Sequence, residues 1–557
     1  MIPCVTVSTV NHDLETRVAA CRGGAVATAH PAATAAAQEI AAGGGNAIDA
    51  AVAAAWALSV VEPAGSGLGG QTVVLLRLAG GSTVVVDGHS RAPAAVSLQT
   101  VSWRQQRQGH RACAVPSTVA TLGFVQSRYG SLPLERVLGP AIRLAEDGFP
   151  VTPLYRRQVG WCLKSLGASS VTSRLFIPSG SPPRPGDRFR QPELAETLRR
   201  IARFGVGDFY TGSLARDIIQ DMEENRGLVV AEDLRRLELP AVCDPLEVDY
   251  YNFRVLSAPP PGGGVQLLQG LKLLQRLAVR DAGTDQWYAN LAQAVRLVFH
   301  DRERSGIRPD SASRGEFERL LSREHVNELV DSLSRSPRAP DSVEAVEASG
   351  ETTHLCAADN EGNMVALTQS IQSLFGAKVA NARLGFLYNN YLKTCPRRAH
   401  PHQLGSRCLP RSNAAPTLVL RKAPRRTDGA HDWVPFLILG AAGSRRITSS
   451  LLQVISGVLD RQNGLAEALA CPRIHGREDG QVRLEKPAAT DSLCRQLSQN
   501  FGQVLIQAPL SYSMGSVQAI QFMEDGRTVA AADPRRDGTA AILGTAARKD
   551  ELQTIRT

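Results

Sequence analysis

The residue pattern changes close to position 352, and this change constrains the fold more than any other feature of the chain. From about 115 to 345, apolar residues recur at the spacing of amphipathic helices. From Thr352 on, THLCAAD and MVALTQSI alternate around the turn Asn360–Asn363, which predicts a β-hairpin. Strands flanked by helices favour a layered core of the α/β or α+β class.

Two helices are predicted near the beginning of the chain. Residues 31–42 are rich in alanine, start with Pro31 and are followed by three glycines. Asn46 then suits the N-cap of a second helix, with Asp49 in its first turn. Apolar residues surround that helix on all sides, so we expect it to be fully buried.

The glycine cluster Gly65–Gly70 has the spacing of a dinucleotide-binding loop. Such a loop follows a strand and begins a helix, whereas here a strand-like segment comes after the glycines. We therefore interpret the cluster as a place where backbone segments pack closely, and expect no cofactor there.

Net charge argues against a nucleic-acid partner. The chain has 62 basic and 53 acidic residues, a net charge of +9, and the two signs are interspersed.

The sequence also gives no sign of export, membrane insertion or a metal site. The first residues lack the basic and apolar regions of a signal peptide, and the longest uncharged helical stretch, 50–61, is too short to span a bilayer. The ten cysteines form no CxxC pair and no zinc-type cluster, which is typical of reduced thiols. We expect a cytoplasmic protein without a metal or membrane partner.

The junction SGETTH, 349–354, is the most informative site. A polar segment, 308–350, which we expect to be exposed and mobile, meets the predicted hairpin there. A cut before Thr352 would place an α-amine, with a pKa near 7.7–8, on the same residue as a hydroxyl nucleophile. The stretch by itself favours a plain strand that starts with two β-favouring threonines.

A series of motifs decides between these interpretations, because it is similar in order and spacing to the γ-glutamyltranspeptidase family. The motifs extend over nearly the whole chain, and the most specific are HPAATAAAQEIAAGGGNAIDAAVAAAWAL (30–58), EPAGSGLGG (62–70), DGHSRAP (87–93), PPPGGG (259–264), TTH with DNEGNMVALTQSI (352–371), SNAAPTLVL (412–420), GAAGSRRI (440–447) and DPRRDG (533–538).

The resemblance implies an N-terminal-nucleophile hydrolase with a four-layer αββα sandwich. Such a protein is made as one precursor that cuts itself, here into a large subunit, 1–351, and a small subunit, 352–557, which form one intertwined domain.

The resemblance also assigns the catalytic groups. Thr352 is the expected nucleophile, and Ser370 stands where the family has a second Thr beside the nucleophile's amine. The backbone N–H groups of Gly443 and Ser444 stand at the family's Gly-Gly oxyanion turn. A backbone donor does not depend on the side chain, so Ser444 is compatible with this role.

Substrate recognition is where the chain departs from the family. His89 occupies the place of the Arg that binds the α-carboxylate, with Arg91 two residues away. Ser412 matches the first of two paired serines. The remaining departures are Asn413 at the second serine, and Gln372, Tyr391 and Thr394 at the Asn, Gln and Asp that bind the α-amino group. Without that carboxylate, a substrate ammonium should bind poorly.

These departures leave several functions open. We expect a hydrolase or acyltransferase that passes an acyl group from a small substrate to water or an amine, with a specificity other than glutathione. An acylase, or a C–C hydrolase acting on an oxalyl group in antibiotic biosynthesis, fits that description. The alternatives are a genuine glutathione hydrolase, with Arg91 restoring the site, and a scaffold without activity. Gln372 and Tyr391 suit either a substrate contact or a plain wall of the pocket.

Overall fold

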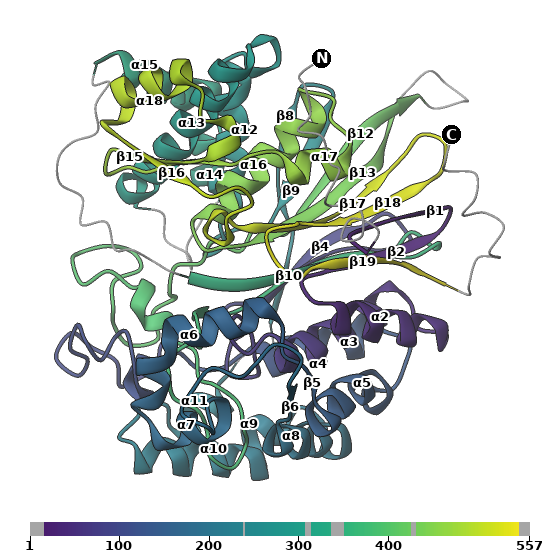
Figure 1. The fold of residues 1–557 in the computed structure, drawn as a ribbon, viewed down its shortest axis with the longest axis vertical. Helices are drawn as coiled ribbons and strands as arrows, with labels where there is room; N and C mark the ends of the chain where they lie inside the picture. The colour runs from purple at the N-terminus through teal and green to yellow at the C-terminus, as the bar shows by residue number, and fades with distance from the viewer. Residues whose placement is uncertain (1–15, 238–239, 307–313, 336–349, 425–430, 545–557) are drawn as a thin grey trace.

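Two antiparallel sheets lie face to face at the centre of the molecule, between two layers of helices (Figure 1). A computed structural model of the chain describes residues 16–237, 240–306, 314–335, 350–424 and 431–544. The first sheet has the strand order β1 (Val18–Cys21), β18 (Thr528–Ala532), β17 (Ser516–Phe522), β13 (His431–Ala442), β12 (Thr417–Pro424), β9 (Phe253–Ser257) and β8 (Leu246–Tyr250). The second has the order β19 (Thr539–Leu543), β2 (Gly24–Thr28), β10 (Gly350–Ala358), β11 (Met364–Ser373), β3 (Gln71–Arg77), β4 (Thr83–Gly88) and β7 (Ala241–Cys243).

Helices cover the outer face of each sheet. The second sheet is covered by a layer that includes α2 (Pro31–Ala42), α3 (Ala47–Val61), α4 (Thr118–Tyr129), α5 (Leu134–Asp147) and α8 (Pro192–Phe204). The first is covered by α12 (Gly264–Arg276), α13 (Thr284–Ser305) and α16 (Arg446–Leu459). This confirms the four-layer αββα sandwich. Strands from both sides of residue 351 take part in each sheet, so neither side could form its sheets alone.

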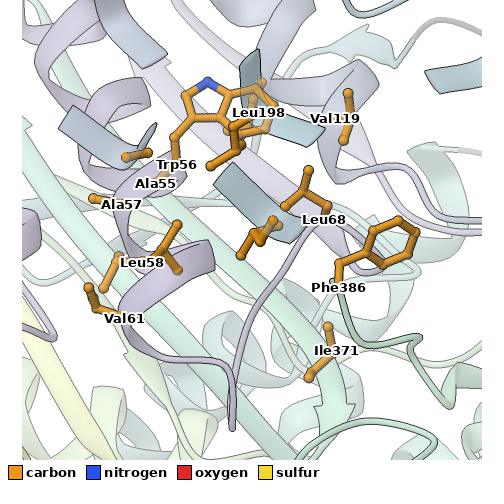
Figure 2. Packing of buried hydrophobic residues seen from close by; sticks show 14 of the residues in the cluster. Ala55, Trp56, Ala57, Leu58, Val61, Leu68, Val119, Leu198, Ile371 and Phe386 are labelled. Atoms are coloured by element: carbon orange, nitrogen blue, oxygen red, sulfur yellow. The ribbon is translucent and has the colours of Figure 1, made fainter. Parts of the chain in front are cut away.

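Helix α3 packs against β10 and β11 of the second sheet. The Asn46 side chain accepts hydrogen bonds from the backbone N–H groups of Ile48 and Asp49, both at 2.9 Å, so the predicted N-cap is confirmed. All fifteen residues of α3 are buried, as the uninterrupted apolar sequence predicted. Figure 2 shows Trp56 and Leu58 of this helix among side chains that include Leu198 and Ile371, the latter from β11.

Small and branched apolar side chains fill the space between the two sheets. Ala27, Cys356 and Ala366 of the second sheet pack with Leu418 and Ile438 of the first, and all five are fully buried. Because stacked sheets approach to about 10 Å, small residues on one sheet accommodate larger ones on the other.

The glycine cluster packs closely against backbone, as predicted. A Cβ atom on Gly69 would lie 2.2 Å from the Leu387 carbonyl oxygen, and one on Gly70 would lie 2.4 Å from that of Ser370. Only glycine fits at these positions. The loop therefore lies directly against the strand that carries Ser370.

The segment 308–350 differs in part from the expected exposed connection. It contains helices α14 (Arg314–Leu320) and α15 (Arg323–Arg335), in which Phe317, Leu320 and Val326 are buried. Phe317 and Leu320, like Val326 and Leu329, are three positions apart, so the spacing of an amphipathic helix was present within the polar composition. Residues 307–313 and 336–349 lie outside the described part of the chain.

Within the described ranges, none of the helices combines the length and the apolar character that crossing a lipid bilayer requires.

Candidate active site

Thr352 lies where the hairpin of β10 and β11 departs from regular pairing. Glu351 pairs with Gln372 and Thr353 with Gln369, so two residues of β11, Ser370 and Ile371, stand opposite Thr352 alone. Gln372 takes up the irregularity with a φ of 81°. Such a bulge turns side chains away from their usual alternation, which allows the Thr352 and Ser370 hydroxyls to meet.

The peptide bond between Glu351 and Thr352 is held by Ser370. The Ser370 hydroxyl donates a hydrogen bond to the Glu351 carbonyl oxygen at 2.6 Å and accepts one from the Gln372 N–H at 2.9 Å. The Thr352 hydroxyl lies 3.4 Å from the Ser370 Oγ. The carbonyl that precedes Thr352 is thus polarised by a hydroxyl that also contacts the Thr352 Oγ1.

Arg536 holds the same peptide from the other side. Its Nη2 forms an ion pair with Glu351 Oε2 at 2.9 Å, and its Nη1 donates to the Thr352 carbonyl oxygen at 3.1 Å. Its guanidinium carbon lies 4.5 Å from the centre of the Tyr512 ring. Burial opposes the charge, but the Glu351 carboxylate, Tyr512 and Glu62 raise the pKa of Arg536 above its ordinary value.

Glu62 completes this buried group directly after α3. Its Oε2 accepts a hydrogen bond from the Thr353 hydroxyl at 2.5 Å. Burial raises the pKa of Glu62 to about 7, although the hydrogen bond from Thr353 and the charge of Arg536 favour its ionised form. We call Arg536 and Glu62 the buried anchor, because together they fix residues 351–353.

A cavity opens beside Thr352. The residues that line it come from three strands of the second sheet, from the chain between β11 and β12, and from the beginning of α16 with the turn before it. They are Gln71, Val73, Thr352, Thr368, Ser370, Gln372, Tyr391, Thr394, Arg411, Ser412, Asn413, Ala414, Ser444 and Ile447. We call Thr352, Ser370 and Ser444 the catalytic wall. The recognition wall is Tyr391, Thr394, Arg411, Ser412 and Asn413.

Gly443 and Ser444 form the connection between β13 and α16. Both have positive φ, 127° and 58°, and a Cβ on Gly443 would lie 2.8 Å from the Gly515 Cα. Neither backbone N–H donates a hydrogen bond to another described residue. These two donors, next to the N-terminus of α16, are suited to stabilise a negatively charged oxygen.

The recognition wall is held by side chains rather than by strand pairing. Tyr391 and Thr394 begin and end a short 3-10 helix, and the Thr394 hydroxyl donates to the Tyr391 carbonyl oxygen at 2.9 Å. The buried Tyr391 hydroxyl interacts with the side chains of Ser370 and Gln71, and burial raises its pKa. Asn413 Oδ1 accepts a hydrogen bond from Arg302 at 2.6 Å.

Two of the predicted substrate residues do not reach the cavity. The His89 ring lies 2.5 Å from Asp87 Oδ1, and the His89 backbone N–H also donates to Asp87. These contacts turn the chain at the end of β4 and keep His89 buried outside the lining, while Arg91 is exposed to solvent. Neither residue is among those that line the cavity, so the replacement of the family's carboxylate-binding Arg by His89 or Arg91 stays a prediction.

Arg411, Arg536 and Glu62 are site residues that the sequence analysis missed. All three lie within or beside quoted motifs, since Glu62 begins EPAGSGLGG, Arg536 lies in DPRRDG and Arg411 precedes Ser412. For Glu62, a charged residue in a motif otherwise rich in small residues was a usable signal. Their partners, however, are distant in the sequence.

Comparison with known proteins shows the family to which the chain belongs. The family model of γ-glutamyltranspeptidase matches residues 33–543. The glutathione hydrolase proenzyme of Escherichia coli (strain K12) is 29% identical over 544 residues, covering 92% of this chain and 90% of that protein. The Acylase ACY 1 proenzyme of Pseudomonas sp. (strain SE83) is 33% identical over 566 residues, covering 96% of both.

A solved structure shows the same architecture. The crystal structure of cephalosporin acylase from Bacillus halodurans superposes with a TM-score of 0.82 at 27% identity, covering 95% of this chain and 97% of that one. The chain therefore belongs to the γ-glutamyltranspeptidase family and is an enzyme of its N-terminal-nucleophile hydrolase type.

Proposed function

We propose that this enzyme is a precursor that cleaves itself before Thr352 and then uses Thr352 to transfer an acyl group, with a specificity other than glutathione. One observation carries the proposal: the Thr352 hydroxyl lines a cavity while Ser370 donates to the carbonyl of the peptide bond that precedes Thr352. The names of two relatives, both called proenzymes, support a processed precursor.

Self-cleavage follows from the contacts around this peptide. Thr352 Oγ1 attacks the Glu351 carbonyl carbon, its C–O bond replaces the C–N bond, and the nitrogen takes a proton to become an amine. Ser370 stabilises the oxyanion during this step, while Arg536 restrains both sides of the bond. Water then hydrolyses the ester, giving subunits 1–351 and 352–557.

Turnover reuses the same hydroxyl. The new α-amine of Thr352 acts as the base for its own Oγ1, which attacks the substrate carbonyl to give an acyl-enzyme. The N–H groups of Gly443 and Ser444 are placed to stabilise the oxyanion, each contributing about 3 kcal/mol. Water or an amine then takes the acyl group.

The composition of the cavity favours a substrate other than a γ-glutamyl group. Its described lining includes one cation, Arg411, and no carboxylate. Thr394 occupies the place from which the family binds the α-ammonium, and its hydroxyl already donates to a backbone carbonyl. A buried ammonium without an anionic partner binds weakly. The two relatives named as acylases support this direction.

Intact-mass measurement after incubation with acyl p-nitroanilides tests the proposal. We expect an acyl adduct on the 206-residue small subunit and a weak reaction with γ-glutamyl p-nitroanilide. If kcat/KM for the γ-glutamyl compound reaches about 10⁴ M⁻¹s⁻¹ or more, the enzyme is a genuine glutathione hydrolase instead. A cleaved protein that forms no adduct with any acyl compound contradicts the proposal as a whole.

A further inference from the structure

Two cysteines lie side by side on the connection between β11 and β12. Cys395 directly follows Thr394, the last residue of the short 3-10 helix, and Cys408 lies three positions before Arg411. Their Sγ atoms are 3.7 Å apart, and both thiols are free. The loop 396–407 therefore begins and ends at two thiols in direct contact, next to residues that line the cavity.

The two thiols differ in acidity. The hydrogen bond between them, together with burial, raises the pKa of Cys395, whereas the same hydrogen bond lowers the pKa of Cys408. Cys395 thus keeps its proton and donates the hydrogen bond, and Cys408 is the thiol that ionises first. The thiolate is the form of cysteine that attacks a disulfide.

Cys408 is also the thiol that a small molecule can reach. It is half-buried, and the two residues before it, Ser406 and Arg407, are exposed. Cys395 is only 3% exposed and packs in an apolar cluster with Leu392. A reactant from solvent therefore meets Cys408 first, while Cys395 is already in contact with the sulfur that reacts.

We propose that Cys408 and Cys395 are a redox-active pair that is oxidised by low-molecular-weight disulfides, and that the resulting bond shifts the recognition wall. The Cys408 thiolate attacks one sulfur of the small disulfide R–S–S–R and forms a mixed disulfide, and the other half leaves as a thiolate that takes up a proton. Cys395 then loses its proton and attacks the Cys408 sulfur, which releases the second half as RSH. The two cysteines lose two electrons in all, and the small disulfide is reduced to two thiols.

Closure of the disulfide should displace the Cys408 side of the loop. A disulfide bond is about 2.05 Å long, so the two sulfurs must approach each other by about 1.6 Å. The Gln106 side chain holds the other side, because it donates to the carbonyl oxygens of Leu392 and Cys395, both at 2.6 Å. Cys408 moves instead, and the nearby Arg411 of the recognition wall moves with it.

This displacement should weaken the binding of substrate. The effect on turnover rests on the acyl-transfer function proposed above, whereas the reaction of the two thiols does not depend on it.

Peptide mapping after treatment with bis(2-hydroxyethyl) disulfide tests the pair. This reagent carries no acyl group, so it is no substrate for the proposed transfer. In the wild-type enzyme we expect a disulfide between the peptides of Cys395 and Cys408, which dithiothreitol reverses. Cys395→Ser should stop at a mixed disulfide on Cys408, and Cys408→Ser should leave Cys395 unmodified.

Cys494→Ser is the matched control, because Cys494 of α18 (Asp491–Phe501) is half-buried like Cys408 but lies outside the loop. It should form the disulfide as the wild type does. The absence of a disulfide in the wild type, or a reagent thiol trapped on Cys395 in Cys408→Ser, would overturn the proposal. If a variant does not fold, the wild-type map decides.

Turnover provides the second measurement. For the acyl p-nitroanilide that the reduced enzyme hydrolyses best, we expect oxidation to raise KM about 3- to 10-fold with little change in kcat, and reduction to restore it. Cys408→Ser should not respond. An unchanged KM in enzyme that contains the disulfide contradicts the effect on the recognition wall.

Amide hydrogen exchange over residues 405–413 reads the same shift without turnover. Exchange should differ between the reduced and oxidised enzyme, and identical exchange contradicts the shift. Failure of the acyl-transfer proposal appears differently, as the absence of turnover with every anilide in both states.

Discussion

The two walls of the cavity are built in different ways. Thr352 and Ser370 of the catalytic wall lie on paired strands, where backbone hydrogen bonds and the buried anchor fix them. The recognition wall lies on the long connection from β11 to β12, where a short 3-10 helix and side-chain contacts hold it. Residues on such a connection can change without disturbing the sheets. Under the proposed function, the residues that perform the chemistry are thus fixed by the sheets, whereas those that set the specificity are not.

The largest expected effect comes from the catalytic wall. Thr352→Ala removes the only hydroxyl that can attack the Glu351 carbonyl in the proposed mechanism, so the chain should stay whole and show no turnover. The wild-type chain should give bands of about 38 and 22 kDa on a denaturing gel, in proportion to subunit lengths, and the smaller should begin TTHLC.

Thr352→Ser is the matched control, since it retains a hydroxyl and should cleave at least partly. A Thr352→Ala protein that still separates into two subunits would contradict the assignment of the nucleophile.

Arg536→Gln tests whether the buried anchor contributes to self-cleavage by the catalytic wall. It leaves the Glu351 carboxylate buried without its partner and removes a donor to the Thr352 carbonyl. Self-cleavage should slow by about 100-fold, measured as the loss of full-length chain after cell-free synthesis.

Adding Glu351→Gln should restore part of that rate, because it removes the unpaired charge. Arg527→Gln, at an exposed ion pair, is the control and should cleave like the wild type. If Arg536→Gln cleaves itself at the wild-type rate, the buried anchor does not contribute to self-cleavage.

A substitution on the recognition wall should change specificity but not self-cleavage. Thr394→Asp places a carboxylate beside Arg411, where it favours a substrate ammonium and competes with a substrate carboxylate. The ratio of γ-glutamyl to glutaryl p-nitroanilide hydrolysis should rise by about tenfold. Thr394→Asn has nearly the same shape without the charge, and an equal rise in that variant would contradict the electrostatic explanation.

The smallest effect is expected in stability. Burial raises the pKa of Glu62 to about 7, above the ordinary value of 4.5. Between those values the folded chain holds a proton that the unfolded chain has released, so stability is highest at low pH and falls as the pH rises through 7. Glu62→Gln should remove this slope. At pH 8 it should raise the free energy of unfolding by about 1–3 kcal/mol, which raises Tm by a few degrees.

This comparison is made by calorimetry in the uncut Thr352→Ala background, at pH 5 and pH 8. In Glu62→Gln the amide oxygen can still accept the hydrogen bond of the Thr353 hydroxyl, so the variant isolates the charge. Parallel pH profiles for the two proteins would show that Glu62 does not titrate in this range.

The sequence by itself determined the features that depend on neighbours along the chain. Helices α2 and α3, the N-cap at Asn46 and the hairpin with Thr352 and Ser370 all follow from periodicity, capping residues and turns within about twenty positions. Close packing of the glycines was also predictable, because a helix did not follow them.

Tertiary structure alone decided which charges reach the site. Arg536 contacts Thr352 from 184 positions away, Arg411 contacts Glu303 from 108, and the His89 ring contacts Asp87, only two residues before it. Helix and strand patterns record local backbone hydrogen bonds, whereas an ion pair depends on where folding places two side chains and on how much water it removes from them.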